Sequence, residues 1–173
     1  MRYVFLALAL MAAPALAQDQ TYRDPSLGFS IAYPAGWTVD AHYARDLSPP
    51  IHGVAFTVPA SFTAGTNLGS DTRLSVEHVA GPCSASRFLD AAVDEHSVTE
   101  DGRTWSVATA SDAGAGNRYE ETVHAVARGE TCFGIHTFIH YAAIENFDPG
   151  TVRAFDRAAL GNIFDRMRRS FAD

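Results

Sequence analysis

Histidine is the residue type in this sequence with the widest chemical use, and the chain has seven of them. In the expected strand 132–141, the alternation of side chains places His136 and His140 on one face. On the preceding expected strand, Glu120 and His124 share a face. Imidazole and carboxylate groups on adjacent strands can ligate zinc or copper. These four residues are therefore the candidate metal site of the sequence.

The metal hypothesis depends on the register of the hairpin that joins these two strands. A three-residue loop sets His124 opposite His136 and Glu120 opposite His140. A loop of two or four residues shifts the pairing by one residue, sets His124 opposite Ile135 and separates the candidate ligands. No ligand-spacing motif accompanies these residues. The alternative interpretation is that the strand histidines are partly exposed polar residues without a metal.

Two cysteines, Cys83 and Cys132, are separated by 49 positions. An even number of cysteines in an oxidising compartment favours a disulfide between them. Closing a loop of this length stabilises a fold by roughly 3 to 4.7 kcal/mol in the chain-entropy model. The alternative is that Cys83 is a nucleophile at the start of a helix, whose N-terminus lowers the pKa of a thiol. Because an exported thiol with one available partner normally oxidises, the disulfide is the favoured prediction.

Catalytic signatures are absent from the sequence. It contains no G-x-S-x-G, H-E-x-x-H or C-x-x-C motif. Neighbouring carboxylates such as Glu120 and Glu121 point to opposite faces of a strand, which predicts surface charge and not a catalytic pair. The segment 114–117, Gly-Ala-Gly-Asn, resembles a flexible turn and lacks the Lys-Ser/Thr end of a phosphate loop. We therefore expect no catalytic residues, and an enzyme of unidentified reaction remains the alternative.

The elements that must position these residues follow from the hydrophobic pattern. Extended patterns predict strands at 21–23, 28–33, 53–58, 72–79, 104–110, 118–127 and 131–142. In strand 72–79, Leu74 and Val76 alternate with Ser75 and Glu77, which predicts one buried and one exposed face. A helix capped by Ser84 or Ser86 is expected to end near His96, and residues 40–50 are expected to be irregular. Apolar residues in steps of three and four predict an amphipathic helix over 151–171.

Composition and charge describe an ordinary globular protein and exclude several partners. Of the 173 residues, 47% are hydrophobic, and 20 acidic residues outnumber 13 basic ones, all of them arginine. The net charge of -7, without a basic run, gives no counterion-release affinity for nucleic acid or anionic lipid. We expect a single domain over residues 18–173 that binds neither nucleic acid nor a charged membrane surface.

The start of the chain predicts export. Met1 and Arg2 precede an apolar stretch over 3–11, and residues 12–17 read AAPALA, which ends in an A-x-A-like cleavage site. A signal peptide over residues 1–17, cleaved after Ala17, predicts a periplasmic protein. The apolar stretch is too short for a membrane span, which needs about 20 residues. No cysteine follows the cleavage site, so we expect no lipid anchor.

Aromatic residues are candidates for the lining of a binding cleft. They are Tyr22, Trp37, Tyr43, Trp105 and Tyr119. The alternative interpretation of each is packing in the core or at its rim.

A local resemblance supports the fold prediction. The segments 21–24 (TYRD) and 28–37 (GFSIAYPAGW) resemble the opening of PsbP-like and DcrB-type envelope proteins, with a Gly-Phe strand and a Pro-x-Gly-Trp break. The whole chain also resembles a family of proteobacterial exported proteins. The PsbP-like resemblance implies an α/β/α sandwich and a non-enzymatic accessory or binding role, as in the extrinsic subunit of the oxygen-evolving photosystem. It carries over no catalytic residue, because the shared motif is structural.

The sequence thus predicts a single-domain α+β fold in which helices cover an antiparallel sheet in an α/β/α sandwich. We expect a periplasmic accessory or binding protein with a disulfide between Cys83 and Cys132 and a protein or small-molecule partner. The first alternative is a periplasmic metal-binding protein that holds zinc or copper on the histidine-bearing hairpin. The second is a periplasmic enzyme, which would require a pocket with convergent polar groups and perturbed pKa values.

Overall fold

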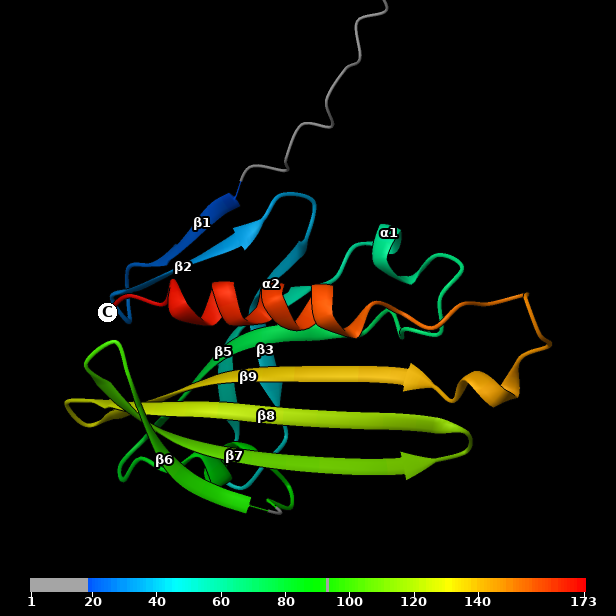
Figure 1. Ribbon diagram of the computed structural model, residues 1–173. Helices are drawn as coiled ribbons and strands as arrows, with labels where there is room; N and C mark the ends of the chain where they lie inside the picture. Colours follow the sequence, from blue (N-terminus) through cyan, green and yellow to red (C-terminus); the bar gives the residue numbers. More distant parts are fainter. Residues whose placement is uncertain (1–18, 93) are drawn as a thin grey trace, which may run out of the picture.

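The computed structural model describes residues 19–92 and 94–173 (Figure 1). The predicted signal peptide over residues 1–17 lies outside the described residues. No helix in the described ranges has the length and apolar character needed to cross a membrane.

A seven-stranded antiparallel sheet and a separate two-stranded hairpin form the frame of the molecule (Figure 1). The large sheet has the order β3-β4-β5-β9-β8-β7-β6, and the hairpin pairs β1 with β2. The strands are β1 (Asp19–Asp24), β2 (Phe29–Pro34), β3 (Thr38–Arg45), β4 (Ile51–Thr57), β5 (Arg73–Ala80), β6 (Asp94–Glu100), β7 (Arg103–Gly114), β8 (Asn117–Arg128) and β9 (Thr131–Ala142). The helices are α1 (Ala60–Thr63), the 3₁₀ turns η1 (Ala85–Phe88) and η2 (Ile144–Asn146), and α2 (Arg157–Arg169).

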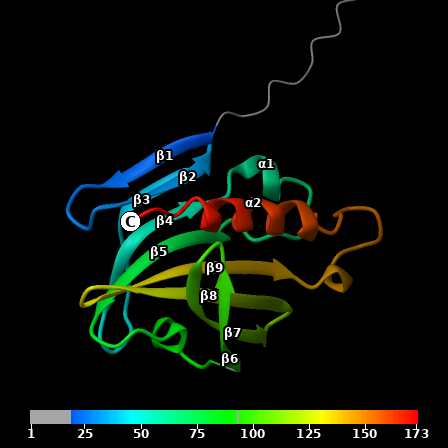
Figure 2. The same cartoon turned by 60° about the vertical axis from the view of Figure 1, so that its left-hand side comes forward.

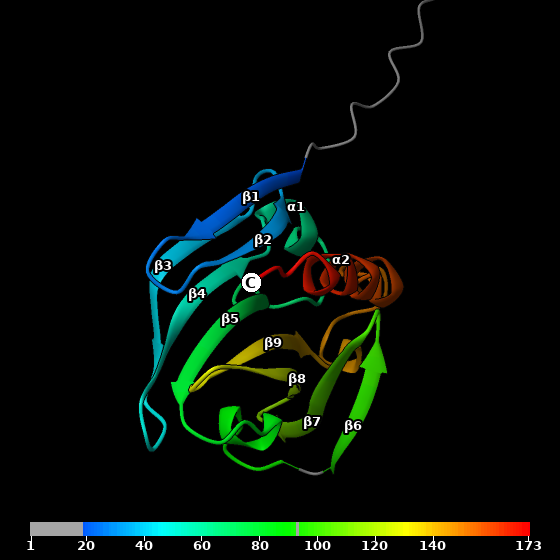
Figure 3. The ribbon, with the colours of Figure 1, turned by 90° about the vertical axis from the view of Figure 1, so that its left-hand side faces the viewer.

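The two faces of the large sheet are covered differently. Helix α2, helix α1 and the β1–β2 hairpin lie on one side, which we call the helix face (Figure 2). The segment that contains η1 packs against the opposite side, which we call the loop face (Figure 3). The α+β class predicted from the sequence is confirmed, with an antiparallel sheet between these two layers.

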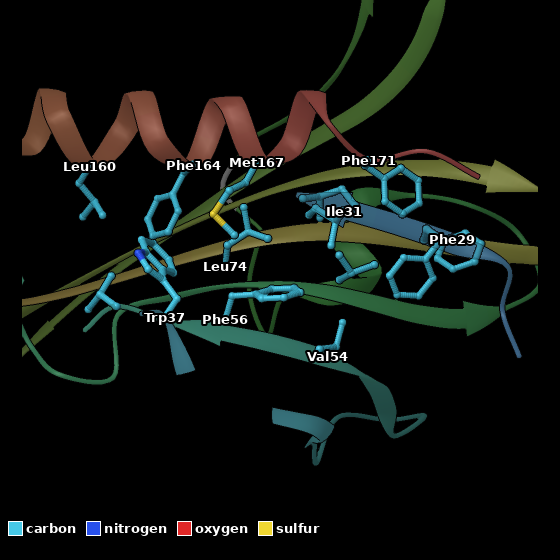
Figure 4. Packing of buried hydrophobic residues seen from close by; sticks show 14 of the residues in the cluster. Phe29, Ile31, Trp37, Val54, Phe56, Leu74, Leu160, Phe164, Met167 and Phe171 are labelled. Atoms are coloured by element: carbon cyan, nitrogen blue, oxygen red, sulfur yellow. The ribbon is translucent and has the colours of Figure 1, made fainter. Parts of the chain in front are cut away.

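The main hydrophobic core lies between the helix face and α2. Asp156 caps the helix, because its side chain accepts a hydrogen bond from the backbone of Ala159. Leu160, Phe164 and Met167 lie on the buried side of α2 and point toward the sheet (Figure 4). Fully burying side chains of this size contributes about 1.5 to 3 kcal/mol each. The predicted C-terminal helix is confirmed, although it begins at its cap and not at residue 151.

A smaller core lies on the loop face, under the segment that follows β5. Phe88 is fully buried, and its ring packs directly on the backbone of Gly134, where a Cβ would lie 2.9 Å from the ring. Cys83 and Cys132 form the predicted disulfide, which ties this segment to β9. The loop face is therefore covered at one end by a short segment and a covalent link.

The helix expected after Ser84 was a wrong prediction, because only the 3₁₀ turn η1 forms there. The Ser84 side chain does not cap the turn, and its hydroxyl instead donates to Glu95. Glu95 belongs to β6, which pairs with β7 along its full length. Residues 40–50 also differ from the prediction, because β3 is a bulged edge strand that extends to Arg45.

Candidate functional site on the loop face

The β8–β9 hairpin has a two-residue turn, which is the register that separates the candidate metal ligands and not the one that the metal hypothesis required. His124 pairs with Ile135, and His136 pairs with Val123. A shift by one residue moves a side chain to the other face of a sheet. The histidines at these two positions therefore lie on opposite faces.

The four residues of the sequence-predicted metal site are divided between the two faces. His136 and His140 lie on the loop face, whereas Glu120 and His124 lie on the helix face. Glu120 forms an ion pair with Arg157 of α2. Within residues 19–92 and 94–173, no three His, Cys, Asp or Glu side chains are placed to hold a metal ion. The structure therefore does not bring the predicted ligands together.

His136 instead lies at the centre of a buried ionic network. Its Nδ1 lies 3.0 Å from Oε1 of Glu77, and its Nε2 lies 2.8 Å from Oε2 of Glu121. Glu77 and His136 have no exposed side-chain surface, and Glu121 is 20% exposed. Ser75 donates a hydrogen bond of 2.7 Å to Glu77. Three neighbouring strands, β5, β9 and β8, thus supply one continuous polar cluster.

Arg45 connects this network to the covering segment. Its Nη1 donates a 2.6 Å hydrogen bond to the carbonyl of Phe88 and lies 3.4 Å from Glu77. Its Nη2 lies 3.7 Å from Glu121. One guanidinium therefore links the edge strand β3, the central strands and η1. Removing one partner of such a network leaves an uncompensated buried charge, so its members act as a unit.

The network sets the protonation states of its members. Burial lowers the pKa of His136, but the contacts with Glu121 and Glu77 outweigh it and raise that pKa above its ordinary value. Burial raises the pKa of Glu77, yet His136, Arg45 and Ser75 together lower it. The pKa of Glu121 is lowered in the same way, mainly by His136. The two carboxylates therefore favour the protonated form of His136, while Nη1 of Arg45 lies 3.0 Å from its Nδ1.

His140 belongs to a second polar cluster further along the loop face. Its Nδ1 lies 2.7 Å from Asp71, and its Nε2 lies 3.0 Å from the side-chain oxygen of Asn117. The ring stacks on Tyr119, with 4.6 Å between ring centroids. Gly69 leaves room for this ring, because a Cβ there would lie 2.6 Å from Nδ1. Both ring nitrogens are thus engaged within the protein.

An arginine and two aromatic rings lie between the two clusters. The guanidinium of Arg73 lies 4.2 Å from the ring centroid of Phe138 and 5.4 Å from that of Tyr43. Its Nε donates a 3.1 Å hydrogen bond to the hydroxyl of Tyr43, and its Nη1 donates to the backbone of Asp71. Burial and Glu77 raise the pKa of Tyr43, so this hydroxyl stays protonated. These groups are half-buried and lie on rigid strands.

We call this row the aromatic stripe. Its members are Tyr43, Arg73, Phe138, Tyr119 and His140. It continues across β3, β5, β9 and β8 on the loop face. The stripe is half-buried, whereas the charged groups of the neighbouring ionic network contact one another.

Comparisons with solved structures identify the fold. The solution structure of cyanobacterial PsbP (CyanoP) from Synechocystis sp. PCC 6803 matches with a TM-score of 0.52 and 17% identity. The match covers 95% of this chain and 98% of that chain. The fold is PsbP-like. A crystal structure from Bacteroides thetaiotaomicron matches with a TM-score of 0.51 and 13% identity, over 90% of this chain and 48% of that one. No protein-family model and no curated protein matches the sequence.

The residues that carried the resemblance form the start of the PsbP-like fold. The TYRD segment lies in β1, and the Gly-Phe strand becomes β2, with Phe29 and Ile31 buried in the main core. Trp37 follows the break after Pro34 and is buried against Phe164. The resemblance to PsbP-like proteins is therefore confirmed at the level of the fold.

The candidate cleft aromatics divide in the same way as the histidines. Trp37 and Trp105 are buried core residues, and Tyr22 packs against that core. Tyr43 and Tyr119 belong to the aromatic stripe. The sequence therefore identified two members of the aromatic stripe as candidates, but it did not predict that they lie on the same face of the sheet.

Other residues of the loop face were missed or placed wrongly. Ser75 and Glu77 were expected on an exposed face but are fully buried. Glu121 was expected as surface charge but contacts His136. The available signal was the alternation in β5, which puts Arg73, Ser75 and Glu77 on one side. Local pattern does not show that the η1 segment and Arg45 cover that side.

Proposed function

We propose that this chain is an exported, non-catalytic accessory protein that binds a protein partner through the aromatic stripe on the loop face. The observation that carries the proposal is the position of Arg73, a half-buried guanidinium stacked between two aromatic rings of the stripe. Within the described part of the chain it forms no ion pair with a carboxylate, whereas the neighbouring Arg45 contacts two. Aromatic and arginine side chains are enriched at protein interfaces.

The charge of Arg73 indicates the chemistry of the partner. A guanidinium prefers a carboxylate that it can contact with two parallel hydrogen bonds. We therefore propose a partner segment that places an acidic side chain on Arg73 and apolar groups beside Phe138 and Tyr119. Strand positions hold the recognition groups with little flexibility, which lowers the entropic cost of binding.

The state of the ionisable groups on this face supports a non-catalytic role. Glu77 and His136 are fully buried and bonded to each other, so neither reaches a substrate. Glu121 contacts His136 and Arg45, and His140 contacts Asp71 and Asn117. A general acid or base must lie within hydrogen-bond reach of the proton that it transfers. These groups instead fix the shape of the surface around the stripe.

Export is part of the proposal and rests on the sequence and the disulfide. The N-terminal segment has the pattern of a signal peptide, and the Cys83–Cys132 bond fits an oxidising compartment. We expect N-terminal sequencing of the protein recovered from a periplasmic fraction to begin at Gln18. A full-length chain retained in the cytoplasm, with reduced cysteines, would contradict export.

Site-specific photo-crosslinking in the producing cells tests the binding site. A benzoylphenylalanine placed at Tyr119 should form a defined cross-linked species with one protein, and the same group at Ile144 serves as the exposed control. Replacing Arg73→Ala in the Tyr119 variant should remove the species, because the partner loses its charged contact. Arg73→Lys should restore part of it, since lysine keeps the charge but not the planar stacking.

Two results would contradict the proposed function. One is that the folded Tyr119 variant forms no cross-link, or the same cross-links as the Ile144 variant. The other is that the cross-linked species persists in Arg73→Ala. Circular dichroism and the melting temperature of each purified variant show whether the fold is intact.

A further inference from the structure

Three histidines other than those of the loop face gather at one cavity beside the β1–β2 hairpin. The cavity has a volume of about 320 Å³, and His42, His52, His78 and Asp24 are among the residues that line it. Figure 3 shows the turn between β1 and β2 beside β3 and β4, which explains how Asp24 reaches this place. The cavity is separate from the aromatic stripe except for Tyr43, which borders both.

The register of the sheet brings two of these histidines face to face. His52 of β4 pairs directly with His78 of β5, and their ring centroids are 6.5 Å apart. The β-bulge between Asp40 and Tyr43 inserts an extra residue into the edge strand. His42 lies in this bulge, and it lines the cavity together with the histidine pair.

In the described residues, several polar atoms around this cavity make no side-chain hydrogen bond. Within residues 19–92 and 94–173, the imidazoles of His42, His52 and His78 take part in no side-chain hydrogen bond or ion pair. Asp24 uses Oδ1 to accept from Ser26 and Leu27, and its Oδ2 accepts none of these bonds. This contrasts with His136 and His140, whose ring nitrogens each lie within 3.0 Å of a polar side chain.

We propose that His52, His78 and Asp24 form a binding site for a divalent transition-metal ion, Zn²⁺ or Cu²⁺, with His42 or water completing the shell. Imidazole nitrogen and carboxylate oxygen are the donors that these ions take in proteins. No arginine lines the cavity, and the carboxylate of Asp24 favours a cation. In the described residues these donors do not converge on one point. Metal binding therefore requires the exposed rings of His42 and His52 to turn toward His78.

Such an ion would link elements that are far apart in the sequence. Asp24 ends β1, whereas His52 and His78 belong to the large sheet. A ligand that binds only the folded state stabilises it in proportion to the logarithm of its concentration above Kd. We therefore expect the metal to raise the melting temperature as well as to bind.

Isothermal titration calorimetry on the untagged, EDTA-treated mature protein tests the site, with ZnCl₂ and CuCl₂ as the probes. We expect one ion per chain, with Cu²⁺ bound more tightly than Zn²⁺. His52→Ala and His78→Ala should each weaken binding by at least about tenfold, and Asp24→Asn by less. His96→Ala is the matched control, because this histidine is exposed beside Asp94 on β6, at the opposite edge of the large sheet from β3.

The melting temperature without metal shows whether each variant is folded, and the metal-induced rise provides a second readout. The proposal is overturned if neither ion binds stoichiometrically to the wild-type protein. It is also overturned if His52→Ala and His78→Ala bind as the wild type does, or if His140→Ala loses the metal while His78→Ala keeps it. The last result would return the site to the β8–β9 hairpin.

Discussion

His124 and His136 lie on neighbouring strands and are offset by one residue in register, yet the two faces of the sheet give them opposite chemistry. On the loop face, Glu121 and Glu77 overcome the cost of burial and raise the pKa of His136. On the helix face, burial and the nearby Arg168 lower the pKa of His124 to about 4. Protonation of the His136 ring is therefore favoured, whereas the His124 ring is neutral beside Trp105.

The difference shows that the partner strands, and not the residue type, decide what a strand histidine does. His136 meets two carboxylates because Glu77 and Glu121 point to the same face from the strands on either side. In the described structure, Nδ1 of His124 and Nε2 of His136 are both buried without a hydrogen bond of good geometry, but only Nε2 of His136 lies beside a carboxylate, 2.8 Å from Glu121. The loop face therefore contains the charged framework that supports the stripe, and the helix face contains the apolar core.

The largest expected effect comes from breaking the network at its most buried carboxylate. Glu77→Ala should reduce the free energy of unfolding by about 3 to 5 kcal/mol, because it removes the fully buried carboxylate of the two that balance His136 and Arg45. Urea denaturation at about pH 6 measures the loss. The matched control is Glu120→Ala on the helix face, whose carboxylate is 39% exposed and pairs with Arg157.

The control should cost less than about 1 kcal/mol, because an exposed ion pair contributes little. Equal losses from Glu77→Ala and Glu120→Ala would show that the two faces do not differ in the way described. Glu77→Gln separates charge from volume. It should retain part of the packing but still lose the ion pair.

A smaller effect is expected from releasing the cover of the loop face. The double variant Cys83→Ser/Cys132→Ser removes the link between the η1 segment and β9. We expect a loss of about 2 to 4 kcal/mol, because the unfolded chain regains the entropy of a loop that the disulfide closed. Hydrogen exchange should show faster opening at Phe88 than at Phe164, which packs in the main core. Equal acceleration of both sites would contradict a cover that opens separately.

Much of the fold could be predicted from local pattern. The Gly-Phe strand and the Pro-x-Gly-Trp break before Trp37 indicated the start of the fold, and the period of α2 indicated its buried side. The helix after Ser84 could not be excluded from the sequence, because serines there are good helix caps. In the structure, the Ser84 hydroxyl donates to Glu95 of β6 and does not cap a helix. Tertiary pairing overrode the local preference there.

The site depended on quantities that local pattern does not contain. The hairpin turn has two residues and not three, and this single difference placed His124 and His136 on opposite faces. The burial of Glu77 required the segment from η1 to cover its face. The pairing of His52 with His78 required the order of β4 and β5 in the sheet. Each is a long-range contact that a residue's immediate neighbours do not encode.

The central claim is that two carboxylates on the loop face favour the protonated form of His136 and that the helix face keeps His124 neutral. The linked stability follows from these shifts. Because the pKa of His136 is raised, its contribution is present below about pH 6.5 and is lost as the pH rises through the folded value. Because the pKa of His124 falls to about 4, its contribution is present above about pH 6.5 and is lost as the pH falls toward 4.

The most direct test is a pH titration of the imidazole nitrogens by NMR, with His136→Gln and His124→Gln used to assign the two rings. The account predicts that His136 loses its second ring proton at a higher pH than an ordinary histidine, whereas His124 stays neutral down to about pH 5. Two rings that titrate together near their ordinary value, or in the reverse order, would contradict it.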